Sequence, residues 1–204
     1  MKVKICGIKS QEAAKYAVEH GADAIGFVFA NSKRQIPLMD AKEIINELPA
    51  AVWKVGVFVN EDAETIVQTA KTAGLTHIQL HGEEQIEAYR NIDLPIIRSV
   101  SVSPGEDLTR IKKLKADFVL LDSPPEKFHG GNGMSFNWNL AEGIGASQQN
   151  VILAGGLNRD NVQAAISKIQ PFMVDVSSGV ETDGQKDLSK IRAFINKAKG
   201  IEEE

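Results

Sequence analysis

Short apolar runs alternate along this chain with longer segments in which apolar residues recur at helical spacing. The runs predict strands near 2–6, 23–29, 52–59, 76–80, 95–100, 117–121, 150–154 and 172–177. The amphipathic segments predict helices near 10–20, 40–48, 62–73, 83–92, 105–115, 138–144, 158–169 and 187–199. Repeated strand–helix units are typical of a parallel sheet, so we expect an α/β protein formed by a single (β/α)8 barrel of the TIM type over 1–204.

The alternation of side chains along a strand predicts which residues face the barrel interior. Lys4 and Cys6 share one face of the first strand, and Asp175 and Ser177 share one face of the last. These two strands become neighbours when a barrel closes. We therefore expect Lys4 and Asp175 to point inward and to pair, since an interior charge without a partner is costly.

Composition and charge exclude several classes of function. A formal net charge of -4, with no block of Lys or Arg, gives no sign of a nucleic-acid partner or a membrane surface. Cys6 is the only cysteine, which excludes an internal disulfide and a cysteine-rich metal site and is typical of a reducing compartment. The first residues include no apolar signal segment, so we expect a cytoplasmic protein.

Glycine-containing turns follow the last two predicted strands. These turns are Gly155-Gly156 and Ser177-Ser178-Gly179. Such turns expose backbone N–H groups to an anion, and barrels commonly bind phosphate after their last two strands. Either turn alone could use glycine only to bend tightly. Because the two strands are adjacent, the pair of turns favours a phosphorylated small molecule as the ligand.

The best candidates for proton transfer also lie at strand ends. Cys6 ends the first strand and Asp122 the sixth, so both side chains should face the mouth of the barrel. The alternatives are a small buried hydrophobe for Cys6 and a turn residue for Asp122. His81 ends the fourth strand, where it could contact substrate or cap a helix. Arg34 lies in the long loop 30–39 and could bind a carboxylate or phosphate, or be solvated.

The histidines do not form a metal-binding pattern. His77 and His81 lie about 13 Å apart if they share a strand with a rise of ~3.3 Å per residue, which is too far for one ion. The chain also has no phosphate-binding or dinucleotide-binding fingerprint of the usual kinds. We therefore expect no metal and no cofactor, and acid–base chemistry on a phosphorylated small molecule.

The segments that carry these residues resemble the phosphoribosylanthranilate isomerase family of tryptophan biosynthesis, essentially from end to end. The matching motifs are Lys4-Ile5-Cys6-Gly7-Ile8, 21–29, Ser32-Lys33-Arg34, 55–60, Gln79-Leu80-His81-Gly82-Glu83-Glu84, Leu121-Asp122, Gly155-Gly156-Leu157-Asn158 and 174–181. The resemblance implies a single (β/α)8 barrel without a cofactor. Its implied reaction is the Amadori rearrangement of N-(5-phosphoribosyl)anthranilate to 1-(2-carboxyphenylamino)-1-deoxyribulose 5-phosphate.

The resemblance also implies roles for the candidate residues. Cys6 would be the general base, Asp122 the general acid, and Arg34 the contact for the anthranilate carboxylate. His81 and Asp175 are further expected substrate contacts, and the two glycine-containing turns would bind the phosphate.

Two positions depart from the family's pattern, Asn132 and Asn137, and both lie in the long loop 123–138. They bear on that loop rather than on the acid–base pair.

Other functions stay open at the level of the sequence. One is another phosphate-binding barrel isomerase or epimerase, of which a metal-dependent one would lose activity in EDTA. A different class is a noncatalytic phosphosugar-binding barrel, which would have no need for Cys6 and Asp122 at one mouth. We expect a monomer, with a homodimer as the alternative.

Overall fold

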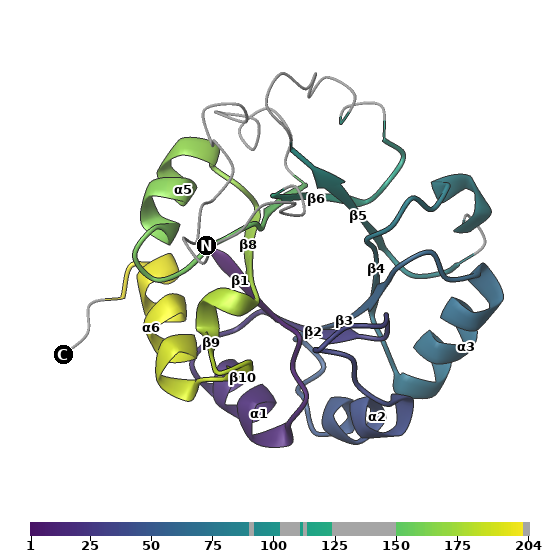
Figure 1. Ribbon diagram of the computed structural model, residues 1–204, viewed down its shortest axis with the longest axis horizontal. Helices are drawn as coiled ribbons and strands as arrows, with labels where there is room; N and C mark the ends of the chain where they lie inside the picture. Colours follow the sequence, from purple (N-terminus) through teal and green to yellow (C-terminus); the bar gives the residue numbers. More distant parts are fainter. Residues whose placement is uncertain (90–91, 103–110, 112–113, 124–149, 202–204) are drawn as a thin grey trace.

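The protein, represented by a computed structural model, is described over residues 1–89, 92–102, 111, 114–123 and 150–201. Parallel strands form a closed barrel in the order in which they occur in the chain (Figure 1). The strands are β1 Lys2–Cys6, β2 Ala24–Val28, β3 Trp53–Phe58, β4 His77–Leu80, β5 Ile96–Ser101, β6 Phe118–Asp122, β7 Val151–Leu153 and β8 Met173–Val176. The predicted strands and the predicted barrel are confirmed.

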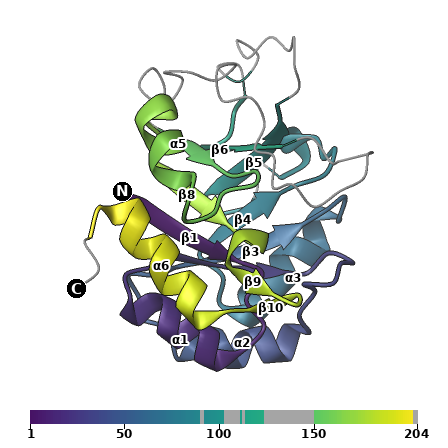
Figure 2. The ribbon, with the colours of Figure 1, turned by 60° about the vertical axis from the view of Figure 1, so that its left-hand side comes forward.

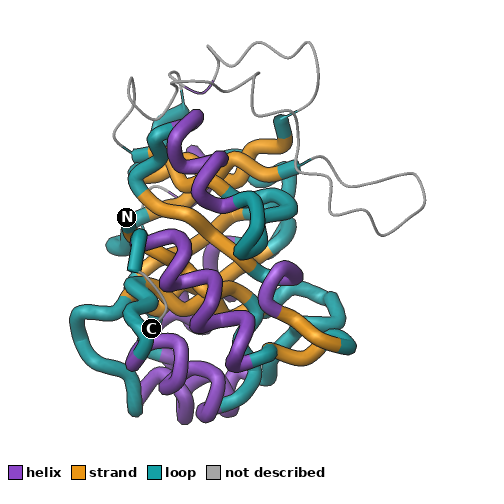
Figure 3. The backbone as a smooth tube through the Cα atoms, turned by 90° about the vertical axis from the view of Figure 1, so that its left-hand side faces the viewer, coloured by secondary structure: helices purple, strands orange, loops and turns teal. Residues whose placement is uncertain are grey.

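The helices cover the outer face of the strands, as Figures 2 and 3 show. They are α1 Gln11–Glu19, α2 Leu38–Asn46, α3 Ala63–Ala73, α5 Val162–Ile169 and α6 Leu188–Lys199. Two helices begin with a side-chain cap: Ser10 accepts the N–H of Ala13, and Asp187 accepts that of Lys190. The predicted helix 138–144 lies outside the described residues, as does most of 105–115. In the described part, no helix is both long and apolar enough to span a membrane.

The predicted helix over 83–92 is wrong in its described part, where the chain forms only the short 3-10 helix η1, Ile86–Tyr89. The cause is Glu84, whose carboxylate turns inward. It accepts N–H groups from Asn60 and Gly82 and pairs with Arg98 at 2.7 Å. A residue held in this way cannot continue a surface helix.

A small hairpin after β8 has no counterpart among the predicted elements. It comprises the 3-10 helix η4 Ser178–Val180 and the strands β9 Glu181–Thr182 and β10 Gln185–Lys186, which pair antiparallel. In the sequence the hairpin lies between β8 and α6, and in space it lies beside α6 (Figure 2). Two of its charged residues, Glu181 and Lys186, contact residues at the barrel mouth, as described below.

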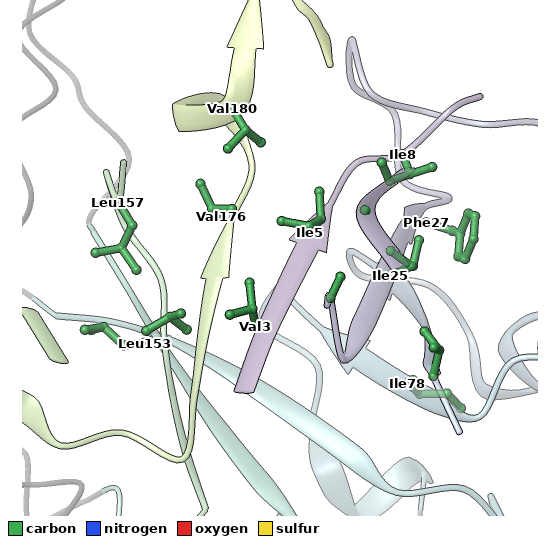
Figure 4. Packing of buried hydrophobic residues seen from close by; sticks show 14 of the residues in the cluster. Val3, Ile5, Ile8, Ile25, Phe27, Ile78, Leu153, Leu157, Val176 and Val180 are labelled. Atoms are coloured by element: carbon green, nitrogen blue, oxygen red, sulfur yellow. The ribbon is translucent and has the colours of Figure 1, made fainter. Parts of the chain in front are cut away.

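Hydrophobic side chains form two clusters on opposite faces of the strands. The larger cluster packs between strands and helices, and Figure 4 shows Val3 and Ile5 of β1 in it. The smaller cluster includes Leu120 of β6 and Ile152 of β7, which alternate with residues of the larger one and so face the interior. Full burial of one such side chain stabilises the fold by about 1.5–3 kcal/mol. The strands are therefore held from both sides, and their ends are fixed in space.

Candidate active site

The carboxyl ends of the strands surround a cavity of about 330 Å³. It contains the predicted site residues Cys6, Arg34, His81, Asp122, Gly155, Gly156, Asp175, Ser177 and Ser178. The structure thus brings together residues that are up to 172 positions apart in the chain, because all lie at or just beyond the same ends of the strands. A larger groove between α5 and α6 holds none of these residues.

A chain of polar contacts crosses the barrel interior, and four of its five members line this cavity. Lys4 Nζ lies 3.0 Å from Asp175 Oδ2 and 3.0 Å from Gln79 Oε1. Gln79 Nε2 lies 3.1 Å from His81 Nδ1, and His81 Nε2 lies 3.3 Å from Asp122 Oδ2. We call this Asp175–Lys4–Gln79–His81–Asp122 sequence the polar chain. The predicted pairing of Lys4 with Asp175 is confirmed, and β1 and β8 place the two residues opposite each other in register.

The charge of Lys4 is held in place by its neighbours. Its side chain is fully buried. Burial by itself would lower the pKa of the ammonium, but the carboxylate of Asp175 and the nearby Cys6 outweigh burial and raise the pKa above the ordinary value. Lys4 is therefore a permanent cation inside the barrel, one strand repeat below the thiol.

The same surroundings also raise the pKa of the Cys6 thiol, which in a thiol favours the neutral form. Burial raises the pKa of Cys6, and Asp175 raises it further, while the ammonium groups of Lys4 and Lys186 offset only part of the rise. At neutral pH the resting group is therefore the neutral thiol. Once formed, the thiolate would be a stronger base than a solvent-exposed one.

The first glycine turn, after β7, has a backbone that favours glycine. Gly155 and Gly156 have φ angles of 78° and 66°, in the left-handed region that other residues rarely adopt. Asn161 donates from its side chain to the Gly156 carbonyl at 2.9 Å, which fixes the turn.

The second glycine turn, after β8, is tied to β1 and to the hairpin. Ser177 Oγ donates to the Cys6 carbonyl at 3.1 Å, and Lys186 Nζ donates to the Ser177 carbonyl at 2.9 Å. Gly179 does not line the cavity. A methyl group at Gly179 would collide with the carbonyl of Leu157, so its glycine allows the two turns to pack together.

Arg34 is oriented by an ion-pair cluster on the hairpin. Its Nε and Nη2 donate to Glu181 at 2.7 and 2.9 Å, and Lys186 Nζ donates to the same carboxylate at 2.8 Å. Burial would raise the pKa of Glu181, but the hydrogen bonds and charges of Arg34 and Lys186 lower it to about 2. The guanidinium thus uses one side for Glu181, and Nη1 takes no part in that bidentate pair.

Sequence reasoning missed Gln79, Glu181 and Lys186. A signal existed for Gln79, since alternation places it on the same face as His77 and His81. No comparable signal existed for the other two, because their role depends on an unpredicted hairpin. Among the described residues, no group of three or more His, Cys, Asp or Glu side chains could hold a metal ion.

Comparisons with known proteins agree with one another. The family model for N-(5'phosphoribosyl)anthranilate isomerase matches residues 3–197. The N-(5'-phosphoribosyl)anthranilate isomerase of Bacillus mycoides is 56% identical over 98% of both chains. The phosphoribosyl anthranilate isomerase of Thermotoga maritima superposes with a TM-score of 0.87 at 44% identity, covering 98% of this chain and 99% of that one. A further solved relative, 43% identical with a TM-score of 0.84 and covering 98% and 99% of the chains, holds reduced 1-(o-carboxyphenylamino)-1-deoxyribulose 5-phosphate.

Proposed function

Because the chain belongs to the N-(5'-phosphoribosyl)anthranilate isomerase family, and so isomerises phosphoribosylanthranilate in tryptophan biosynthesis, we propose that Cys6 and Asp122 transfer the protons of that reaction. One observation carries the proposal. Cys6 and Asp122 line the same cavity, and both glycine turns line it as well. A phosphosugar anchored by those turns would lie between an acid and a base.

The first step needs an acid. Asp122 donates a proton to the ribose ring oxygen, the C1′–O bond breaks, and the nitrogen lone pair forms a Schiff base at C1′. Asp122 suits this role because its carboxyl group faces the cavity while Ser123 N–H holds Oδ1 at 2.8 Å and His81 contacts Oδ2. These contacts fix the direction in which the acid points.

The second step needs a base. The Cys6 thiolate removes the proton from C2′, and the electrons move towards the Schiff-base nitrogen to give an enolamine, which tautomerises to the ketose. Burial raises the pKa of Cys6, which reduces the population of thiolate but makes each thiolate a stronger base. The ammonium of Lys4 stabilises the thiolate when it forms.

The rest of the cavity provides contacts for the substrate's other groups. Arg34 holds the anthranilate carboxylate with the Nη1 side of its guanidinium, because Glu181 occupies the other side. The N–H groups of the two glycine turns hold the phosphate. Asp175 Oδ1 is buried without a hydrogen-bond partner among the described residues, so it is suited to accept a hydrogen bond from a sugar hydroxyl, and His81 borders the same cavity.

The experiment is a fluorescence assay with freshly prepared phosphoribosylanthranilate. Cys6→Ala and Asp122→Asn should each lose about 10²–10⁴-fold in turnover. Both should still bind the reduced product analogue, since neither residue anchors the phosphate. Asp40→Asn, the same chemical change at an exposed position of α2, is the matched control and should keep full activity.

Turnover by either site variant at the parent rate would overturn its role. Loss of the parent's activity in EDTA would favour the metal-dependent alternative instead. For the assembly and location, we propose a cytoplasmic monomer, in keeping with a biosynthetic enzyme. The comparisons also include a Thermotoga maritima relative described as dimeric, so light scattering decides between monomer and homodimer.

A further inference from the structure

Gln79 lies at the centre of the polar chain and is not among the groups that react. Its residue is 2% exposed in the middle of β4. Its amide oxygen accepts from Lys4 Nζ at 3.0 Å. Its amide nitrogen lies 3.1 Å from His81 Nδ1 and 3.3 Å from Ser99 Oγ. The amide therefore connects the buried cation to the histidine that contacts the proposed acid.

The direction of these hydrogen bonds follows from the chemistry of the partners. An ammonium can only donate, so the amide oxygen of Gln79 must face Lys4. The NH2 group must then face His81 and Ser99, one N–H for each. Because an N–H donates into His81 Nδ1, that nitrogen must carry its lone pair. The ring proton therefore resides on Nε2, which lies 3.3 Å from Asp122 Oδ2.

We propose that Gln79 is a positioning residue that keeps His81 as the neutral imidazole with its proton on Nε2, the nitrogen that lies 3.3 Å from Asp122 Oδ2. This inference rests on the proposed function, in which Asp122 is the acid. A doubly protonated His81 would place an Nδ1–H against the NH2 of Gln79, which is repulsive. It would also place a cation beside Asp122 and favour the carboxylate, depriving the acid of its proton. Lys4 thus acts on Asp122 through two intermediate side chains.

The charged groups around His81 do not have the same effect as the hydrogen bond from Gln79. His81 borders two cavities, and the ionisable residues that line them are Cys6, Arg34, Glu83, Arg98, Asp122 and Asp175. Within the described residues, the groups in hydrogen-bond or ion-pair contact with the His81 ring are Gln79 and Asp122. Asp122 would favour the imidazolium only when it is ionised. Gln79 is the contact that opposes the second proton.

The test is the protonation state of His81, observed by nitrogen-15 NMR of its ring. His81→Asn identifies the signal, since the chain has 4 histidines. In the parent at neutral pH, Nε2 should carry the proton and Nδ1 should not. In Gln79→Met, which removes the N–H donor at similar volume, His81 should take up its second proton at a higher pH than in the parent. In Gln79→Glu, whose carboxylate accepts from Nδ1–H, the change should be larger still.

Ser99→Ala is the matched control. It removes the other acceptor of the same amide but leaves the contact between Gln79 and His81. Its His81 ring should titrate as in the parent. Turnover should change together with the protonation state of His81. Gln79→Met should lose about tenfold in kcat with little change in KM, and the loss in kcat should be larger on the acid side of its pH profile.

Three outcomes would overturn the proposal. One is a parent ring with its proton on Nδ1. Another is a Gln79→Met ring that titrates as in the parent, and the third is an altered ring with unchanged kcat. If Gln79→Glu fails to fold, the Gln79→Met result still decides. A parent enzyme that lacked isomerase activity would instead contradict the proposed function, and the NMR result would stand apart from it.

Discussion

The two ends of the barrel interior carry opposite kinds of side chain, although the same strands build both. At the carboxyl ends lies the polar chain, in which each described member has a hydrogen-bonded or charged neighbour. At the amino ends, four rings form an aromatic layer: Trp53, His77, Phe118 and Phe172. Lys2 Nζ lies 4.7 Å from the ring centroid of Phe172 and closes this layer from the amino side.

The two histidines of β4 show what this difference means for a single residue type. His77 begins the strand and stacks on Trp53 with ring centroids 3.8 Å apart, and burial lowers its pKa to about 4. His81 follows the strand's last residue and lies between an amide and a carboxylate. Of these identical side chains four residues apart, His77 stacks in the aromatic layer with one hydrogen bond, to Thr76 Oγ1 at 2.9 Å, whereas His81 lies between polar groups. The position along the strand determines the role of each histidine. This agrees with the rule that the amino-terminal face of such a barrel serves stability and the carboxyl-terminal face serves catalysis.

The strongest test of this difference between the two ends is to remove Trp53, the largest ring of the aromatic layer. Trp53→Ala should destabilise the fold by about 3 kcal/mol, because it leaves a cavity among three other rings. Its kcat and KM should stay at parent values, since the layer does not touch the cavity at the mouth. Urea unfolding measures the loss of stability. The isomerase assay, run under conditions in which the variant is folded, measures kcat and KM. Cys6→Ala is the reciprocal control, expected to lose turnover with a smaller loss of stability.

A drop in turnover of Trp53→Ala under conditions where it is fully folded would show that the two ends are coupled. The division between a stabilising end and a reactive end would then be wrong.

A somewhat smaller effect should come from His77 and appear in the pH dependence of stability. Because the pKa of His77 is about 4 when folded and near 6.5 when unfolded, the unfolded chain takes up the proton first on acidification. The destabilisation caused by this protonation of His77 is absent above about pH 6.5 and grows as the pH falls to about 4. The expected loss from this residue is about 2 kcal/mol between pH 7 and pH 5.

His77→Phe keeps a ring on Trp53 and should flatten this part of the stability profile, measured by urea unfolding at each pH. The same substitution at His20, which stacks on Tyr16 outside the aromatic layer, should leave the acid sensitivity of the parent. An unchanged profile in His77→Phe would contradict the assignment of His77 as a neutral packing group.

The pattern of the chain predicts the barrel because burial acts on every strand in the same way. Apolar runs such as Val151–Leu153 are buried on both faces, as is typical of parallel strands that are covered by helices on one side and closed into a barrel on the other. Alternation then predicts the pairing of Lys4 with Asp175, since a closed interior leaves few partners for a charge. These inferences need only the sequence and the period of a strand.

Other features depend on contacts that no local pattern contains. Residues 83–85 read as the start of a helix until Arg98 and the backbone of Asn60 draw Glu84 inward. Arg34 reads as a carboxylate contact, but its orientation depends on Glu181 in a hairpin of four strand residues. Tertiary contacts override local propensity in both places.

The smallest expected effect concerns the thiol of Cys6 at the carboxyl ends of the strands. Burial there should shift the pH at which the thiol ionises, whereas burial of His77 at the amino ends keeps that ring neutral. Since burial raises the pKa of Cys6, its alkylation by iodoacetamide should reach half of its maximal rate at a higher pH than that of a free thiol, near 8.5. Cys6 is the only cysteine, so the labelled fraction reports this group alone. Lys186→Met removes one of the ammonium groups that lower the pKa and should move the midpoint further up. A midpoint at or below that of the free thiol would mean that the cations at the mouth outweigh burial, and Cys6 would then be a resting thiolate and a weaker base than proposed.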